Sequence, residues 1–265
     1  MKSRILLICG NNPRNLFLYK CISSEYEISG IIIQNRSDLN PSPMESISNR
    51  DKGNFIKHFS NRDKIESHFF DKSLSFDDVE TIEVDANNIS SLYVLDFVKK
   101  IKPDIVFTCG VAMIKDPLFS ALPKTTINLH SGITPRYKGS AGNFWPFYFL
   151  EPNWAGATFH ILSPQLDMGG IVHQTVPNLE YGDSIHQVAC KAITLACHDS
   201  LKIIDKYNSK GFITSVEKQF TGKLFLEKEF RAEHLRVVYE LFNDNIVDHF
   251  LDSDIQPNPP KLVEM

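Results

Sequence analysis

Unbroken apolar runs alternate with amphipathic segments along the first 205 residues of the chain. Continuous Ile, Leu and Val, without polar alternation, is typical of parallel strands that are buried on both faces. Strands are predicted at 4–9, 28–34, 81–84, 105–109 and 126–129, followed by a strand pair at 156–162 and 170–175. This order predicts an α/β fold, a Rossmann-like doubly wound and mostly parallel sheet with helices on both faces.

Helices are predicted where apolar residues recur three or four positions apart. Such segments lie at 15–22, 90–101 and 143–150, and a longer one runs from 184 to about 207 with Asp183 as its N-cap. Residues 35–54 are polar and contain two prolines, which predicts a surface excursion, and a short helix is expected over 55–70. We therefore expect a catalytic domain at 1–205, with a polar insertion at about 35–75.

The remaining residues, 206–265, form a short C-terminal extension in this interpretation. The sequence predicts a hairpin around Gly222, a helix near 233–242 and a proline-rich end. The extension would either cover the catalytic domain or pair with a second subunit as a homodimer.

Composition narrows the class of protein. Hydrophobic residues make up 42% and charged residues 23%, as in ordinary soluble domains. With 28 Lys and Arg against 32 Asp and Glu, the net charge is −4, which argues against a nucleic-acid partner. No apolar stretch approaches the roughly 20 residues of a membrane span. Five cysteines without a CxxC pair favour reduced thiols and a cytoplasmic location.

The most informative segment is 127–139, INLHSGITPRYKG. Asn128 and His130 alternate at the end of a predicted strand, so both side chains leave on one face. The loop after this strand lies at the carboxyl edge of the sheet, where open α/β folds bind ligands. A second polar loop, 163–170, supplies Asp167.

An amide, an imidazole and a carboxylate are sufficient for acyl transfer without a covalent intermediate. When an amine attacks a formyl carbon, negative charge builds on the formyl oxygen. A protonated His130 and the amide of Asn128 would stabilise that oxygen. Asp167 would favour the protonated imidazole and assist removal of the proton from the amine.

These motifs resemble a known family. N-x-H followed by a Pro and a Gly, and then L-D-x-G-x-I about 40 residues later, is similar to the formyltransferase domain that uses N10-formyltetrahydrofolate. The family includes glycinamide ribonucleotide transformylase, methionyl-tRNA formyltransferase and the sugar N-formyltransferases. The resemblance implies catalytic roles for Asn128, His130 and Asp167 and requires no metal. It also implies folate contacts from two loops, at Val111, Ala112, Met113, Ile114, Ser163, Gln165 and Leu166.

One departure from the family pattern indicates a branch. The purine and tRNA enzymes continue the motif as HPSLLP, whereas this chain has HSGITP running into Phe144-Trp-Pro-Phe-Tyr148. This form resembles the branch that formylates nucleotide-linked amino sugars for lipopolysaccharide and O-antigen synthesis. The extension carries eight Lys or Arg against ten Asp or Glu, a poor surface for RNA. Other amine acceptors, and a non-catalytic nucleotide-binding module, remain open alternatives.

Candidate contacts to the sugar nucleotide occupy two loops. The first comes after the first strand and would hold a phosphate at a helix N-terminus, and the second belongs to the catalytic motif. They comprise Asn11, Asn12, Arg14, Arg136, Tyr137, Lys138 and Gly139. The simpler alternative is a capped turn and solvated loop cations. The aromatic block at 144–149 is expected to pack in the core, and the histidines match no metal-ligand spacing.

Overall fold

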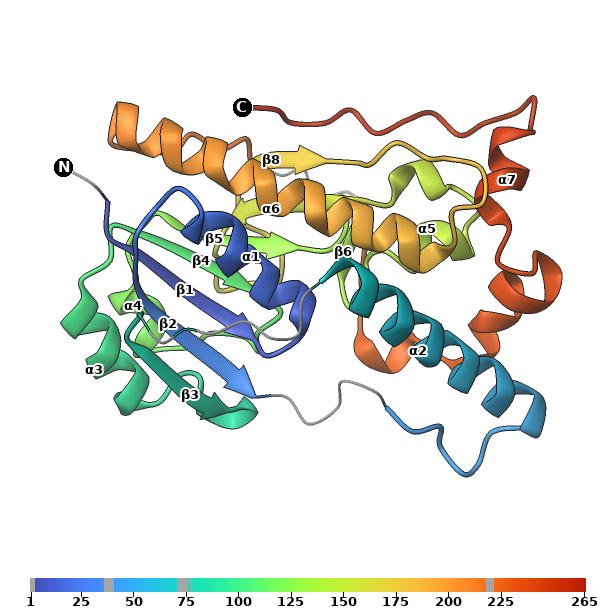
Figure 1. The fold of residues 1–265 in the computed structure, drawn as a ribbon, viewed down its shortest axis with the longest axis horizontal. Coiled ribbons are helices and arrows are strands. Elements are labelled where there is room, and N and C mark those ends of the chain that lie inside the picture. Colours follow the sequence, from blue (N-terminus) through green and yellow to red (C-terminus); the bar gives the residue numbers. More distant parts are fainter. Residues whose placement is uncertain (1–2, 36–40, 71–75, 77, 218–221) are drawn as a thin grey trace.

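The computed structural model describes residues 3–35, 41–70, 76, 78–217 and 222–265. A seven-stranded sheet forms its centre (Figure 1). In the order β3-β2-β1-β4-β5-β7-β8 the strands are Thr81–Asp85, Ile28–Asn35, Ile5–Gly10, Ile105–Cys109, Thr126–His130, Ala157–Ile161 and Ile171–Thr175. The first five are parallel, and β7 runs antiparallel to both of its neighbours. The predicted α/β fold with a mostly parallel sheet is confirmed.

Both faces of the sheet are covered, which explains the unbroken apolar runs. In β1, Ile5, Leu7 and Cys9 belong to the core shared with α1 (Pro13–Ser23) and α6 (Ile185–Lys210). The alternate residues Leu6 and Ile8 belong to a second core with α3 (Leu92–Ile101) and α4 (Leu118–Ala121). Because neither face of β1 is exposed to water, its sequence does not alternate between polar and apolar residues.

Helix α6 differs from its prediction at both ends. Ser184, not Asp183, is the N-cap: its hydroxyl accepts from the Gln187 N–H at 3.3 Å, and Gln187 closes a capping box. Asp183 instead accepts from the backbone N–H of Glu180 and pairs with Lys191. The helix continues to Lys210, so the expected domain boundary at 205 falls within its last turns.

The region expected to be a surface excursion with a short helix holds α2, which spans 21 residues from Asn49 to Phe69. Ser48 caps it, accepting from the Asp51 N–H at 3.1 Å. The helix packs on α6 and on the extension, and it belongs to the wall of the main cavity. The prediction of a helix at 55–70 was therefore too short, and residues 36–40 and 71–75 of the insertion lie outside the described residues.

The C-terminal residues beyond α6 pack against the preceding part of the chain. Strand β9 (Lys223–Phe225) of this extension pairs in parallel with β6 (Tyr137–Gly139), so the predicted local hairpin around Gly222 was wrong on its described side. Residues 218–221 lie outside the described part. Helical turns at Glu227–Glu229, Ala232–His234 and Val237–Leu241 replace the regular helix expected at 233–242, and α7 (Ile246–Leu251) comes next.

The aromatic block packs mainly as core, as expected. Helix α5 spans only Trp145–Tyr148, with short 3-10 turns elsewhere at Ala86–Asn88 and Pro152–Trp154. Phe144, Trp145 and Phe147 are buried against the extension in a third apolar cluster. In the described residues, no helix is both long and apolar enough to cross a membrane.

Candidate active site

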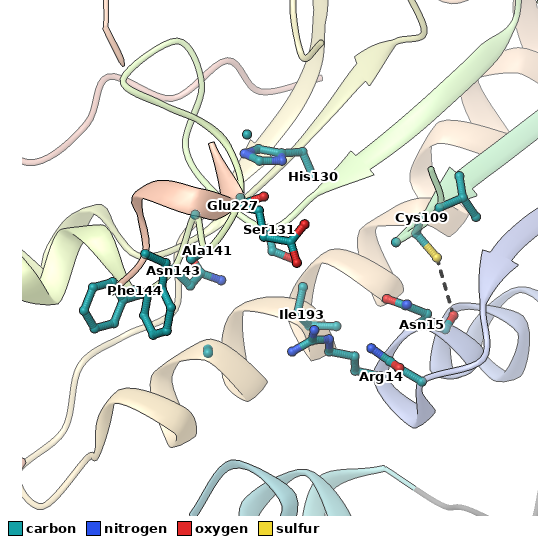
Figure 2. A pocket seen from close by; sticks show the side chains of 18 of the residues that line it. Arg14, Asn15, Cys109, His130, Ser131, Ala141, Asn143, Phe144, Ile193 and Glu227 are labelled. Carbon is teal, nitrogen blue, oxygen red and sulfur yellow. Dashed lines mark hydrogen bonds between the residues drawn. The ribbon is translucent and has the colours of Figure 1, made fainter. Parts of the chain in front are cut away.

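A cavity of about 780 Å³ opens at the carboxyl ends of β1, β4 and β5. One side is formed by the segments at the ends of strands: 110–114, 128–131 and 162–167. The other side is formed by α2, α6 and residues of the extension. Figure 2 shows His130 and Arg14 on opposite sides of this pocket. A cavity of this size suits a small-molecule ligand.

Three polar side chains form a row across neighbouring strands. The register places Thr108 on β4 beside Asn128 on β5, and Asn128 opposite His160 on β7. The Thr108 hydroxyl donates to the Asn128 amide oxygen at 2.8 Å, and the amide nitrogen lies 3.1 Å from His160 Nε2. The bond from Thr108 fixes the orientation of the Asn128 amide and leaves its N–H bonds as donors.

His130 and Asp167 meet at the same edge, as the sequence predicts. The distance from His130 Nδ1 to Asp167 Oδ2 is 3.4 Å, and the two side chains are only 8% and 6% exposed. The other ring nitrogen, Nε2, donates to the carbonyl oxygen of Tyr137 at 2.9 Å. Because a carbonyl oxygen can only accept, Nε2 carries a proton. In the cationic imidazole, the second proton on Nδ1 would face the Asp167 carboxylate.

The carboxylate of Asp167 is shared between two imidazoles. Its second oxygen lies 3.2 Å from His160 Nε2, and the Gly139 N–H donates to Oδ2 at 2.7 Å. Burial by itself raises the pKa of Asp167, but the charges of His130 and His160 and the hydrogen bonds outweigh it and hold this pKa well below its usual value. Asp167 is therefore a carboxylate at any physiological pH.

The backbone at Gly139 holds this arrangement together. Its φ is +85°, and a Cβ there would lie 2.2 Å from the carbonyl oxygen of Phe225 on β9. Only glycine adopts this positive φ readily and also lacks the Cβ that would clash with Phe225. The N–H that binds Asp167 thus belongs to a residue that the extension fixes in place.

All seven residues predicted to contact the folate line the cavity. The side chains of Met113 and Leu166 are 47% and 40% exposed. Val111 also packs against the core, so the simpler role of filling the sheet-to-helix junction applies to it as well. The Ala112 N–H donates to the Gln34 side chain at 2.7 Å and is already satisfied in this structure.

The structure separates the predicted substrate contacts. Asn12 and Arg14 line the cavity, as does Gly139, whereas Asn11 is not part of its lining. Arg14 forms an ion pair with Glu66 of α2 at 2.8 Å.

The loop cations Arg136 and Lys138 are not among the residues that line the cavity, and their contact with a diphosphate stays a prediction. Arg136 forms a two-pronged ion pair with Glu151 at 2.7 and 2.6 Å and lies over the Trp154 ring. The Tyr137 hydroxyl donates to the same carboxylate, and Lys138 Nζ lies 3.7 Å from the Met168 sulfur. Arg136 and Tyr137 thus both bind the carboxylate of Glu151.

Several site residues could not be found by reasoning from the sequence. His160 stands in neither catalytic motif, and the part of the chain that the structure describes holds no cluster suited to a metal. Its place beside Asn128 and Asp167 depends on the pairing of β5 with β7. Arg62 of α2 and Glu227 of the extension also line the cavity, and neither stands in a motif.

The fold and this edge of the sheet define a small-molecule transferase site without a metal cluster among the described residues. A family model described as formyl transferase matches residues 28–198. The chain belongs to this family, whose members use N10-formyltetrahydrofolate as the co-substrate.

Two curated relatives match part of the chain. The bifunctional polymyxin resistance protein ArnA of Wigglesworthia glossinidia brevipalpis is 29% identical over 120 residues, 45% of this chain and 18% of ArnA. The methionyl-tRNA formyltransferase of Borreliella burgdorferi is 28% identical over 143 residues, 51% of this chain and 44% of that protein. The chain thus spans less than half the length of these relatives.

Solved structures share the fold. A phosphoribosylglycinamide formyltransferase from Anaplasma phagocytophilum has a TM-score of 0.57 at 17% identity, covering 85% of this chain and 97% of that one. A likely sugar N-formyltransferase from Mycobacterium tuberculosis has a TM-score of 0.55 at 16%, covering 86% and 77%. PseJ from Anoxybacillus kamchatkensis, solved with UDP-4,6-dideoxy-4-formamido-L-AltNAc and tetrahydrofolate, has 0.51 at 16%, covering 91% and 95%.

Proposed function

We propose that the protein transfers a formyl group from N10-formyltetrahydrofolate to the primary amine of a nucleotide-linked amino-deoxy sugar, in the cytoplasmic synthesis of surface polysaccharide. The observation that carries this proposal is the convergence of Asn128, His130 and Asp167 over one cavity. Family membership supports the formyl chemistry. The HSGITP form of the motif, together with sugar N-formyltransferases among the structures of like fold, supports the amino sugar.

The bound donor supplies an activated formyl carbon and a nitrogen leaving group. Because the Asn128 amide oxygen accepts from the Thr108 hydroxyl, its N–H bonds are the groups that can face the formyl oxygen. Because Thr108 fixes the amide, this donor needs little reorganisation when charge develops on that oxygen.

His130 must exchange one hydrogen bond to take part. Its Nε2–H is held by the Tyr137 carbonyl in this structure, and the developing oxyanion would replace that carbonyl as acceptor. A cationic imidazole is favoured by the adjacent Asp167 carboxylate. During transfer a nitrogen–carbon bond forms to the acceptor, the bond from the formyl carbon to N10 breaks, the amine loses a proton and N10 gains one. The imidazole–carboxylate pair lies where that proton can be relayed.

Formation of tetrahydrofolate in the presence of different amines tests the proposal. The full chain is incubated with N10-formyltetrahydrofolate and dTDP-, UDP- or GDP-linked 3-amino and 4-amino sugars, with glycinamide ribonucleotide and methionyl-tRNA in parallel. We expect release with at least one amino sugar, and a formamide product of matching mass. Release only with glycinamide ribonucleotide or methionyl-tRNA would overturn the amino-sugar assignment. Release with none of these amines would favour a binding module.

The Asn128→Ala variant is the matched control for these assays. It retains both loops expected to hold the folate, so any tetrahydrofolate formed by the wild type but not by this variant comes from the site itself.

A further inference from the structure

The segment after β4 forms part of the cavity wall but has no regular structure of its own. Residues 110–114 line the cavity, and four of them are predicted folate contacts. Residues 111–115 adopt neither helical nor strand structure. Because the hydrogen bonds of a helix or a sheet do not set the shape of this segment, its shape depends on what other parts of the chain bind to it.

Two side chains from elsewhere at the sheet edge bind main-chain N–H groups of this segment. The Ala112 N–H donates to the side-chain oxygen of Gln34, near the end of β2, at 2.7 Å. The Lys115 N–H donates to the Ser90 hydroxyl at 2.9 Å, at an exposed position. Gln34 is instead 0% exposed and is not part of the cavity lining. The buried contact therefore holds the middle of the segment from behind.

Gln34 satisfies two main-chain groups at once. Its Oε1 accepts from Ala112, and its Nε2 donates to the carbonyl oxygen of Ala86 at 2.9 Å. A main-chain N–H can only donate and a carbonyl oxygen can only accept, so the side-chain amide has one possible orientation. Gln34 thus ties the segment 110–114 to the connection between β3 and α3, with no freedom to exchange its two ends.

This contact decides which main-chain groups of the segment face the cavity. The peptide between Val111 and Ala112 is trans, and in a planar trans peptide the N–H and the carbonyl point in opposite directions. The Ala112 N–H points at a buried side chain, so the Val111 carbonyl oxygen is directed away from Gln34. Both residues of this peptide line the cavity and Gln34 does not, which directs that oxygen to the cavity side.

We propose that Gln34 is a positioning residue for the folate, which orients the Val111–Ala112 peptide so that the pteridine meets a carbonyl acceptor at this point of the wall. The pyrimidine edge of a pteridine carries N–H donors beside ring acceptors. A flipped peptide would place a donor where the acceptor belongs and would leave polar groups unmatched. This inference rests on the folate half of the proposed function, and not on which amine accepts the formyl group.

Equilibrium binding of tetrahydrofolate, followed by fluorescence, tests the inference without turnover. Gln34→Met keeps the length of the side chain and removes both hydrogen bonds, so we expect it to weaken binding at least about tenfold. Equal affinity of Gln34→Met and wild type would overturn the inference.

Gln174→Met is the matched control for this titration. Gln174 is also buried, binds the Thr134 carbonyl and the Val263 N–H in the same two-ended way, and does not line the cavity. Its substitution should lower the melting temperature and leave the affinity for tetrahydrofolate within about twofold of wild type. Equal weakening in both variants would show that lost stability, and not the peptide orientation, is responsible, and would overturn the inference.

Gln34→Glu provides a readout that a purely structural role would not move, and it decides the matter if Gln34→Met fails to fold. A protonated carboxyl group can accept from Ala112 and donate to Ala86 as the amide does, whereas an ionised one cannot donate. Burial raises the pKa of the introduced carboxyl group. We therefore expect near-wild-type affinity for tetrahydrofolate at about pH 6, and at least about tenfold weaker binding than wild type at about pH 9.

The wild type measured at each pH is the reference for this ratio of affinities. Glu83 and Asp85 of the neighbouring strand β3 are present in both proteins, so their charges contribute to both titrations alike. A ratio that does not change with pH would overturn the inference.

Steady-state kinetics separates the role of Gln34 from the proposed function. With an accepted amine, Gln34→Met should raise the folate KM at least about tenfold and leave the acceptor KM within about twofold. An unchanged folate KM would reject the role of Gln34 and leave the function standing. Folate binding that depends on Gln34, without transfer to any amino sugar, would reject the amino-sugar function and leave the role of Gln34 standing.

Discussion

The two sides of the cavity are built in different ways. On the sheet side, each contributing segment lies directly at the end of a strand, as Gly110 does after β4 and Ser131 after β5. On the helical side, α2, α6 and the extension come from distant parts of the chain and meet through long-range packing and side-chain contacts such as Asp51–Arg236. The rigid sheet edge holds the groups that perform the chemistry, and the assembled side is free to vary with the acceptor.

Loss of the catalytic pair should give the largest effect and is confined to the sheet side. We expect His130→Ala and Asp167→Ala to lower kcat by about 10²–10⁴-fold, because proton transfer and oxyanion stabilisation fail together. Folate affinity, measured by fluorescence titration, should remain close to that of the wild type.

A second buried pair provides the control for that experiment. His173 Nε2 lies 3.0 Å from Asp199 Oδ2, and neither residue lines the cavity. Asp199→Ala should lower the melting temperature and leave kcat nearly unchanged. Comparable loss of kcat in Asp199→Ala and Asp167→Ala would show that the catalytic assignment is wrong.

The hydrogen-bonded row of Thr108, Asn128 and His160 lies next to the His130–Asp167 pair. Substitutions in this row should have a graded effect on kcat. Asn128→Ala removes an oxyanion donor and should lower kcat by about 10²–10³-fold. Thr108→Val removes only the hydroxyl that orients the amide, and about a tenfold loss is expected. Measurement of kcat for both variants under saturating substrates tests the order, and an equal or larger loss in Thr108→Val contradicts it.

On the helical side, the joint between α2 and the extension can be broken selectively. Arg236 binds the buried Asp51 through two hydrogen bonds of 2.7 and 2.6 Å. Arg236→Gln should raise the acceptor KM severalfold with little change in the folate KM, since only the helical side moves. Lys228→Gln, at an exposed position of the same extension, is the control.

The same joint predicts sensitivity to acid. Hydrogen bonds from Arg236 and Ser48 lower the pKa of Asp51 to about 2, despite the opposing effect of burial. A carboxylate with a lowered folded-state pKa stabilises the fold above its unfolded value near 4, and this stabilisation is lost as the pH falls towards 2. The free energy of unfolding, measured with denaturant, should therefore differ most between wild type and Arg236→Gln above pH 4.

Two buried histidines predict a smaller effect at milder pH. Burial lowers the pKa of His186 to about 3, and burial and the neighbouring His186 lower that of His58 well below its usual value. The unfolded chain takes up protons near pH 6.5 and the folded chain does not, so stability falls as the pH falls below 6.5. Each histidine contributes at most about 1.4 kcal/mol per pH unit to this slope.

Removal of one of these histidines tests the slope. His186→Gln should reduce the dependence of unfolding free energy on pH between about 6 and 4. His198→Gln, at an exposed position on the same helix, should leave it unchanged. An unaltered slope in His186→Gln would show that this histidine is not the source.

The same contrast decides how much was predictable. Strand β4 was predicted at its observed bounds, and β5 within one residue. A buried strand can be predicted from its own run of apolar residues, without knowledge of distant contacts. Asn128 and His130 could be placed at the carboxyl edge because both lie at the end of such a strand. Asp167 was joined to them only by the L-D-x-G-x-I resemblance, since β7, which precedes it, runs antiparallel to β5. His160 could not be placed there, because its contact with Asn128 exists only through the antiparallel register of β5 and β7.

Long-range pairing also explains the remaining differences. Arg136 stands in the catalytic motif, yet it binds Glu151, and nothing in the local sequence reveals that partner. Helix α2 begins at a serine cap within a polar stretch, where apolar residues do not recur clearly at helical spacing. The sequence of its first turns therefore predicts a loop. The contact of β9 with β6 joins residues more than 80 positions apart, and a local turn was the only interpretation available.

The glycine at 139 links the two sides. Its N–H holds the carboxylate of Asp167, while its strand hydrogen-bonds to the extension. A change in the extension that shifts β9 will consequently slow turnover and also weaken acceptor binding. Efforts to swap extensions between relatives in search of new acceptors should thus retain 223–225 unaltered and exchange only the residues beyond 225.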